Sequence, residues 1–260
     1  MSRLALVALG GTLLLAAGAR QDGPPRYAAS MLAEAAFDQR VRAEVRTQSG
    51  GATRTEQVSR EGRLRFRVSG MADTLRVEAW FDSLVIWREG PEGRVTPDPD
   101  PIIGGRFRGV VAPDGEMTVQ TRPFVPDDLI EVTDLREVLN TFLPRLPRVA
   151  LQAGAVWEAE GFRIVRRQDS AAGDARLQRY RWSRGQADTV EQGLTDSLRY
   201  QVRSQLEEEG DLVWDPTLGP LVWHRRTTMS MEIPAEGTVR RSARTRMTEE
   251  SWAWRRSEPQ

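Results

Sequence analysis

Apolar and polar residues alternate along most of the chain from Phe37 onward. In the stretch RLRFRV, Leu64, Phe66 and Val68 fall on one face and arginines fall on the other. The stretches LRVEAWF and LTDSLRYQVRSQL repeat this period of two. Strict alternation is typical of strands with one buried and one hydrated face, as in antiparallel sheets. The pattern therefore predicts a protein built mainly from such strands.

Turn sequences separate the alternating runs at short intervals. SGGAT, APDGEM and AAGDA are examples, and Asp114-Gly115 lies between two short alternating runs as a hairpin signal. We expect about ten strands in one large, curved, half-barrel-like antiparallel sheet. The predicted fold class is mainly β, with this sheet packed on one or two helices.

One segment, near residues 127–143, departs from the alternation. Asp134 followed by Glu137 resembles a capping box, and Pro144 and Pro147 follow as helix terminators. We therefore expect a central amphipathic helix near 127–143. Its apolar residues recur at helical spacing: Leu129, Val132, Leu135, Val138, Leu139 and Phe142.

The N-terminus has the form of a secretory signal. Arg3 precedes an apolar run over 4–15, and small residues at 17–19 provide a cleavage site. The run is shorter than the ~20 residues that span a bilayer. We expect a signal peptide at 1–19, a linker or short helix at 20–36 and a single β-rich domain at 37–256.

These features predict a periplasmic or secreted bacterial protein with no stable membrane span after cleavage. No cysteine follows the apolar run, which excludes lipoprotein-type attachment. The 37 basic residues, all arginine, equal the 37 acidic residues. This balance argues against non-specific binding to nucleic acid or to anionic membranes.

Recognisable catalytic chemistry is absent from the sequence. There is no nucleophile elbow, metalloprotease helix or phosphate-binding loop, and one histidine cannot build a histidine-rich metal site. We assign no catalytic residue, metal ligand or cofactor. Glu78, Asp82 and Glu158 flank tryptophans and keep an acid/base hydrolase open as a third alternative, although pairing with arginines explains them better.

The single histidine lies in the stretch EEEGDLVWDPTLGPLVWHRR, which predicts a β-hairpin. A loop over 216–219 would pair Leu212 with Trp223 and Trp214 with Leu221, all facing the core. His224 would then face solvent opposite Asp211. We expect the tryptophans to matter and the histidine to have no catalytic part.

Aromatic and methionine side chains gather in the second half of the chain and suit an adaptable apolar pocket. If the sheet curls and the helix leaves part of it uncovered, a ligand cavity remains beneath them. The alternative is that they simply pack against the helix. The candidate ligand-lining residues are Trp157, Tyr180, Trp182, Trp214, Leu221, Trp223, Met229 and Met231 from the strands, with Leu135, Leu139 and Phe142 from the helix.

Two segments carry a resemblance. FLPRLPRVALQAGAVWEAEG has the form of a helix end followed by a G-x-x-W strand, and GDLVWDPTLGPLVWHRR has a D-P-x-x-G turn between strands. With the signal peptide, they resemble an uncharacterised family of exported bacterial β-rich proteins. The layout is similar to the lipoprotein-carrier type, in which a curved sheet wraps helices and shelters acyl chains.

That resemblance implies an exported, non-enzymatic protein of the cell envelope. Its partner would be a hydrophobic small molecule or lipid held between sheet and helix, or another envelope protein. The alternative from a different class is a structural or protein-interaction module with a filled core and no ligand.

Overall fold

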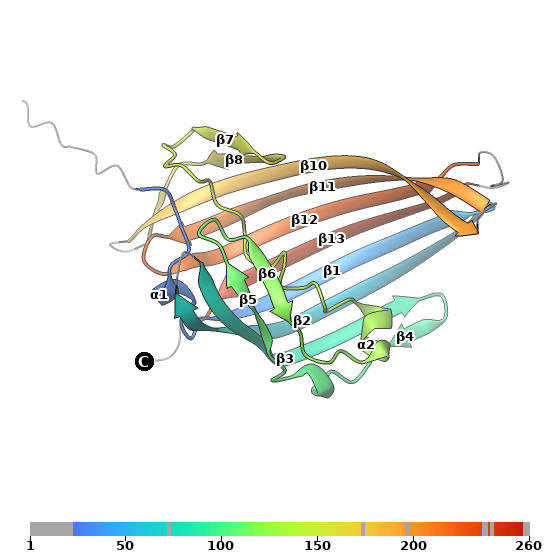
Figure 1. Ribbon diagram of the computed structural model, residues 1–260, viewed down its shortest axis with the longest axis horizontal. Helices are drawn as coiled ribbons and strands as arrows, with labels where there is room; N and C mark the ends of the chain where they lie inside the picture. Colours follow the sequence, from blue (N-terminus) through green and yellow to red (C-terminus); the bar gives the residue numbers. More distant parts are fainter. Residues whose placement is uncertain are drawn as a thin grey trace, which may run out of the picture.

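The computed structural model describes residues 23–71, 74–172, 175–195, 198–235, 239 and 242–256 (Figure 1). The predicted signal peptide and the first residues of the linker lie outside this part of the chain. Two short α-helices, α1 (Ala29–Leu32) and α2 (Asp127–Val132), and one 3-10 turn, Asp100–Ile102, accompany the strands.

Thirteen strands form one curved antiparallel sheet, which confirms the predicted fold class. The number exceeds the expected ten because β4, β7 and β9 are only three or four residues long, too short to show an alternation. The strands are β1 (Ala36–Ser49), β2 (Ala52–Met71), β3 (Leu75–Gly90), β4 (Gly93–Val95), β5 (Phe107–Val111), β6 (Met117–Thr121), β7 (Val156–Ala159), β8 (Phe162–Arg166), β9 (Ser170–Ala172), β10 (Ala175–Thr195), β11 (Leu198–Asp215), β12 (Gly219–Ile233) and β13 (Ala243–Arg255).

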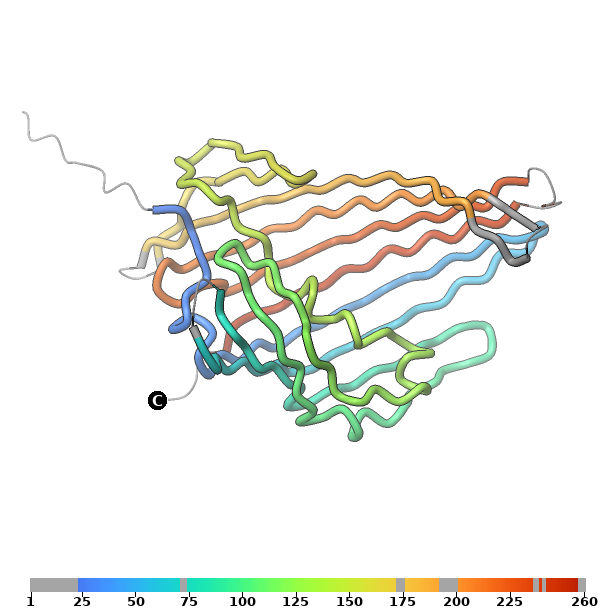
Figure 2. Tube along the Cα trace, in the orientation of Figure 1, coloured from blue at the N-terminus to red at the C-terminus, as the bar shows by residue number. Residues whose placement is uncertain are grey.

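The sheet is open, and the first and last strands of the chain, β1 and β13, are neighbours at its centre. The order is β6-β5-β3-β2-β1-β13-β12-β11-β10-β8-β7, so β6 and β7 end this series. The two remaining strands lie off it, with β4 paired to β3 and β9 paired to β10. β1 and β13 pair from Phe37 opposite Arg255 to Ser49 opposite Ala243. The tube in Figure 2 shows these long strands side by side, with the middle of the chain crossing one face of the sheet. We call that covered, concave face the inner face.

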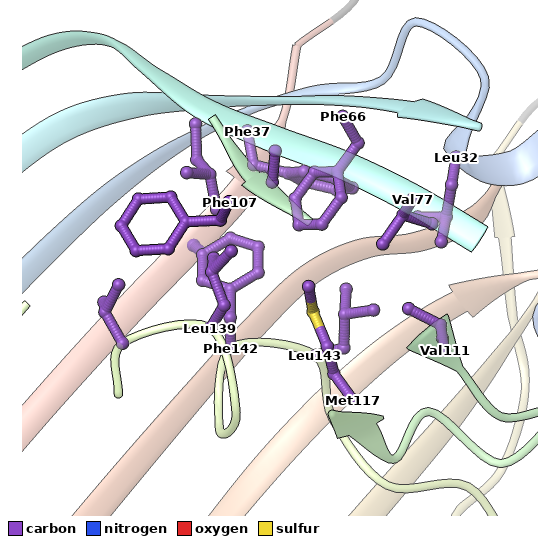
Figure 3. Close-up of a cluster of buried hydrophobic side chains, with 14 of the residues drawn as sticks. Leu32, Phe37, Phe66, Val77, Phe107, Val111, Met117, Leu139, Phe142 and Leu143 are labelled. Carbon is purple, nitrogen blue, oxygen red and sulfur yellow. The ribbon is translucent and has the colours of Figure 1, made fainter. Parts of the chain in front are cut away.

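The hydrophobic core lies at one end of the inner face. Phe37 packs edge-on against Phe66 and Trp223, with ring centroids 5.8 and 5.2 Å apart. Residues 122–155, between β6 and β7, cross this face and are called the crossing segment. Phe142 of this segment packs against Trp223 with ring centroids 5.1 Å apart. Figure 3 shows Phe37, Phe66, Leu139 and Phe142 converging from the sheet and the crossing segment. The apolar residues of the alternating strands therefore lie on the face of the sheet that the crossing segment covers.

The predicted central helix is wrong over most of its length. α2 ends at Val132, and Thr133 is already extended, with φ −157° and ψ 133°. Residues 135–142 instead form successive turns, with backbone bonds such as Phe142 N to Leu139 O at 3.2 Å. Asp134 does not cap a continuing helix; its carboxylate accepts from the backbone N–H and guanidinium of Arg136. Turns that repeat every three residues bury nearly the same positions as a helix would.

The predicted hairpin is present with one change of register. Leu212 pairs with Trp223 as expected, but Trp214 pairs with Pro220 because the register shifts after Val213. The Asp215 carboxylate accepts from the backbone N–H groups of Thr217 and Leu218 at 2.7 and 3.0 Å, which closes a shorter loop. The expected pairing of Leu221 with Trp214 was therefore wrong, and Leu221 lies half-buried outside the core.

Candidate functional site

Two cavities open on the inner face, beside the crossing segment. The first has a volume of about 410 Å³ and lies over β1, β2, β12 and β13. The second, of about 650 Å³, lies toward β6, β8 and β10. Thr141, Phe142, Trp223 and Arg225 line both cavities, so the two adjoin at the crossing segment. Both volumes fall within the range of about 300–1,000 Å³ that is typical of small-molecule sites.

The first cavity is elongated along the strands. It extends along β1 from Gln39 to Val45, a span of about 20 Å at ~3.3 Å per residue. Its apolar walls come from both the sheet and the crossing segment. They are Val41, Val45, Val58, Ile130, Val132, Val138, Phe142, Trp223 and Met247.

A charged group interrupts these apolar walls. Arg60, Arg225 and Glu249 all line the first cavity. The Arg225 guanidinium lies 3.7 Å from the Glu249 carboxylate and donates to the backbone oxygen of Thr141 at 2.5 Å. Arg60 is only 9% exposed. Its pKa is lowered by burial, raised by the charge of Glu249 and lowered again by that of Arg225, with a net decrease.

The charges of the second cavity are largely matched in pairs. Arg184 lies 3.7 Å from Glu208, and Arg145 lies 3.3 Å from Glu160. The indole of Trp182 covers Gly210, its cross-strand partner, where any larger residue would collide with the ring. This second cavity therefore combines an aromatic wall with paired charges.

From the first cavity, whose walls include Val45 and Met247, an apolar row continues across the inner face to positions outside the cavity. Val45 pairs with Met247, Met247 with Met229, and Met229 with Leu206. All four are only half-buried. In Figure 1 the far ends of the long strands extend past the segments that cross the sheet. The row thus prolongs the apolar wall of the first cavity toward open solvent.

The structure divides the predicted ligand-lining residues into three groups. Trp182, Trp223 and Phe142 line cavities. Tyr180, Trp214, Leu135 and Leu139 are packed in the core, and Trp157 packs against it while partly buried. Leu221 and Met229 are half-buried away from both cavities, and Met231 is exposed. Only part of the predicted set therefore adjoins empty space.

Sequence reasoning missed the polar residues of the first cavity. Arg60 shares the period-two phase of Leu64 and Phe66, and Arg225 shares that of Trp223. A charged side chain in phase with core residues was the signal that could have identified them.

His224 lies opposite Asp211 on the outer face, as the hairpin predicted, but it is half-buried and its Nε2 is not exposed to solvent. Its ring stacks on Trp252 with centroids 5.1 Å apart and an interplanar angle of 25°. The carboxylates considered for hydrolysis each lie beside an arginine. Glu78 accepts from Arg108 at 2.8 Å, Asp82 from Arg65 at 3.0 Å, and Glu158 from Arg163 at 3.0 Å.

In the part of the chain that the structure describes, no group of three or more His, Cys, Asp or Glu side chains is placed to hold a metal ion. In the same part of the chain, no helix has the length and apolar character needed to cross a membrane.

Comparison with known proteins gives little further information. No protein-family profile and no curated protein matches the chain. Among solved structures, one match is the crystal structure of a DUF1329 family protein from Desulfovibrio piger. It is 10% identical, 89% of each chain is covered, and the TM-score is 0.16. A match at this level does not establish a shared fold.

Proposed function

We propose that this protein is exported to the bacterial cell envelope and acts there, without catalysis, by binding a hydrophobic ligand such as a lipid. The observation that carries the proposal is the first cavity together with the row Val45, Met247, Met229 and Leu206. They place apolar side chains on the inner face from the walls of the cavity, which the crossing segment partly covers, to half-buried positions outside it. Export is supported by the sequence of residues 1–19.

An uncovered apolar row on a concave face supports ligand binding because contiguous exposed apolar surface marks binding sites. Methionines suit such a surface, since their flexible side chains adapt to ligands of different shape. The packed aromatic cluster of Phe37, Phe66, Phe142 and Trp223 fits the alternative, a structural module with a filled core. The two candidates differ in whether the uncovered row binds anything.

The test is binding by the purified mature protein. Lipids extracted from protein isolated from bacterial envelopes would be identified by mass spectrometry, and a fluorescent fatty acid would be titrated into delipidated protein. We expect saturable binding of one ligand per chain. Met247→Asp should weaken it roughly 10-fold, because a half-buried methionine contributes about 1.5 kcal/mol of apolar contact.

Thr248→Asp is the matched control, because this neighbour on β13 faces the opposite side of the sheet. It should leave binding unchanged. If the protein carries no lipid and the probe does not bind, the hydrophobic-ligand function is wrong and the structural module remains. Intact-mass measurement of the exported protein tests the leader separately, with a loss of residues 1–19 as the expected result.

A further inference from the structure

Three buried nitrogen donors on the inner face have no hydrogen-bond partner. They are Gln39 Nε2, Arg60 Nε and Arg225 Nε, and all three residues line the first cavity. Among the described residues only one other buried side-chain nitrogen or oxygen, His224 Nε2, lacks a partner, and His224 lies on the outer face. The first cavity is thus lined by three residues that each carry a buried N–H donor without an acceptor.

Leaving such groups unpaired is costly, because a buried polar group without a partner loses its hydration without compensation. Arg60 is the most pronounced case. It is nine-tenths buried and forms no ion pair within the described part of the chain. Buried arginines are ordinarily paired with a carboxylate or another anion.

The carboxylates around the first cavity do not supply that partner. Asp134 binds Arg136 at 2.7 Å, and Glu137 binds Arg122 at 2.6 Å. Each therefore has its own exposed arginine. Glu249 lies 3.7 Å from Arg225 and forms its ion pair there, so it reaches Arg60 only through its longer-range charge.

The sheet register places the two arginines on the same face. Arg60 pairs with Val41, Val41 with Ser251, and Ser251 with Arg225, in neighbouring strands from β2 to β12. Both side chains line the same cavity, and the charge of Arg225 is close enough to contribute to the lowered pKa of Arg60. A small anion between them would accept from both.

We propose that the first cavity binds the anionic head of an amphiphile, a carboxylate or a phosphate, between Arg60 and Arg225. Gln39 donates to the same group, and the apolar part lies along Val45 and Met247. This proposal rests on the proposed function and specifies its ligand class. Guanidinium groups suit both heads, because their N–H donors match the oxygens of a carboxylate or a phosphate.

Calorimetric titration of the full mature chain tests this proposal with probes that differ only in the head group. The probes are dodecanoate, dodecyl phosphate and dodecan-1-ol, with inorganic phosphate as a head group without a chain. We expect at least one anionic probe to bind roughly 10- to 100-fold tighter than the alcohol, as charge-assisted hydrogen bonds provide. The order of dodecanoate and dodecyl phosphate identifies the preferred head.

The variants separate the charge from the apolar surface. Arg60→Met should abolish the preference for the anion while leaving binding of the alcohol unchanged. Arg60→Lys, which keeps the charge without the planar fork, should retain part of the preference. Arg42→Met is the matched control, because Arg42 neighbours Val41 on β1 but is exposed on the outer face.

Failure of this inference is distinguishable from failure of the proposed function. Equal affinity for alcohol and anions, unaffected by Arg60→Met, overturns the anion site and leaves hydrophobic binding in place. Binding of inorganic phosphate that depends on Arg60, without binding of the alcohol, supports the anion site and overturns the hydrophobic function. Absence of binding for all four probes overturns both.

Discussion

Replacing Arg60 by methionine should make the protein more stable. The folded state buries this guanidinium and leaves its Nε without a partner. Burial lowers its pKa, which means that the folded state holds the proton less tightly than the unfolded state does. At neutral pH the charge therefore opposes folding. Methionine keeps the apolar stem and removes that cost.

The expected gain follows from substitutions of buried charges by apolar residues of similar volume, which stabilise by about 1–4 kcal/mol where they stabilise at all. Glu249 keeps Arg225 at 3.7 Å, so the change leaves no isolated carboxylate. We expect a gain of about 1–3 kcal/mol, or roughly 2–12 °C in Tm for a domain of this size.

Urea denaturation of the ligand-free protein, followed by tryptophan fluorescence, measures the gain. Arg42→Met is the control and should change the free energy of unfolding by no more than about 0.5 kcal/mol. If Arg60→Met instead lowered the free energy of unfolding by more than about 1 kcal/mol, Arg60 would make a stabilising interaction with a partner in the folded state. The reasoning from its unpaired donor would then be refuted.

Three further changes test other parts of the structure. Gly210→Ala should destabilise by about 1–3 kcal/mol and alter tryptophan emission, because the added methyl group collides with the Trp182 ring; an unchanged emission spectrum would contradict that contact. Burial raises the pKa of Asp114, but hydrogen bonds from Arg148 and a backbone N–H and the nearby arginine charges lower it by more. Its stabilisation should therefore be present above about pH 4 and lost as pH falls further. In denaturant titrations, the stability gap between wild type and Asp114→Asn should shrink as the pH is lowered from about 4 to about 2, and a constant gap would refute this. Tyr27→Phe should cost about 1 kcal/mol in the same assay, because the hydroxyl donates to a buried carbonyl at 3.1 Å, and no loss would show that this bond is not needed.

Local patterns in the sequence predicted the fold class but not the arrangement of the sheet. The phase of Leu64 and Phe66 correctly identified a buried face, and both side chains are fully buried. Pairing of β1 with β13 joins residues as distant as Phe37 and Arg255, and no local pattern encodes such a contact. Strand order therefore came only from the structure.

The crossing segment shows a different limit. Leu135, Leu139 and Phe142 are buried as their spacing indicated, but turns rather than a helix position them. A spacing of three or four residues fits both arrangements, so the pattern predicted burial better than it predicted hydrogen bonding. Likewise, Arg60 and Arg225 were recognisable only by their phase, which carries no information on whether a charged residue has a partner.

The pairing of β1 with β13 divides the protein into two halves that meet along one seam. One half runs from β1 to β6 and the other from β7 to β13, and Arg60 belongs to the first half while Arg225 belongs to the second. The candidate anion site therefore exists only when the seam has formed. A ligand bound by both arginines would contact both halves. Because it binds only when the halves are paired, it would stabilise the folded sheet by mass action. Because the seam joins strands so far apart in the chain, it should also be the slow step of folding.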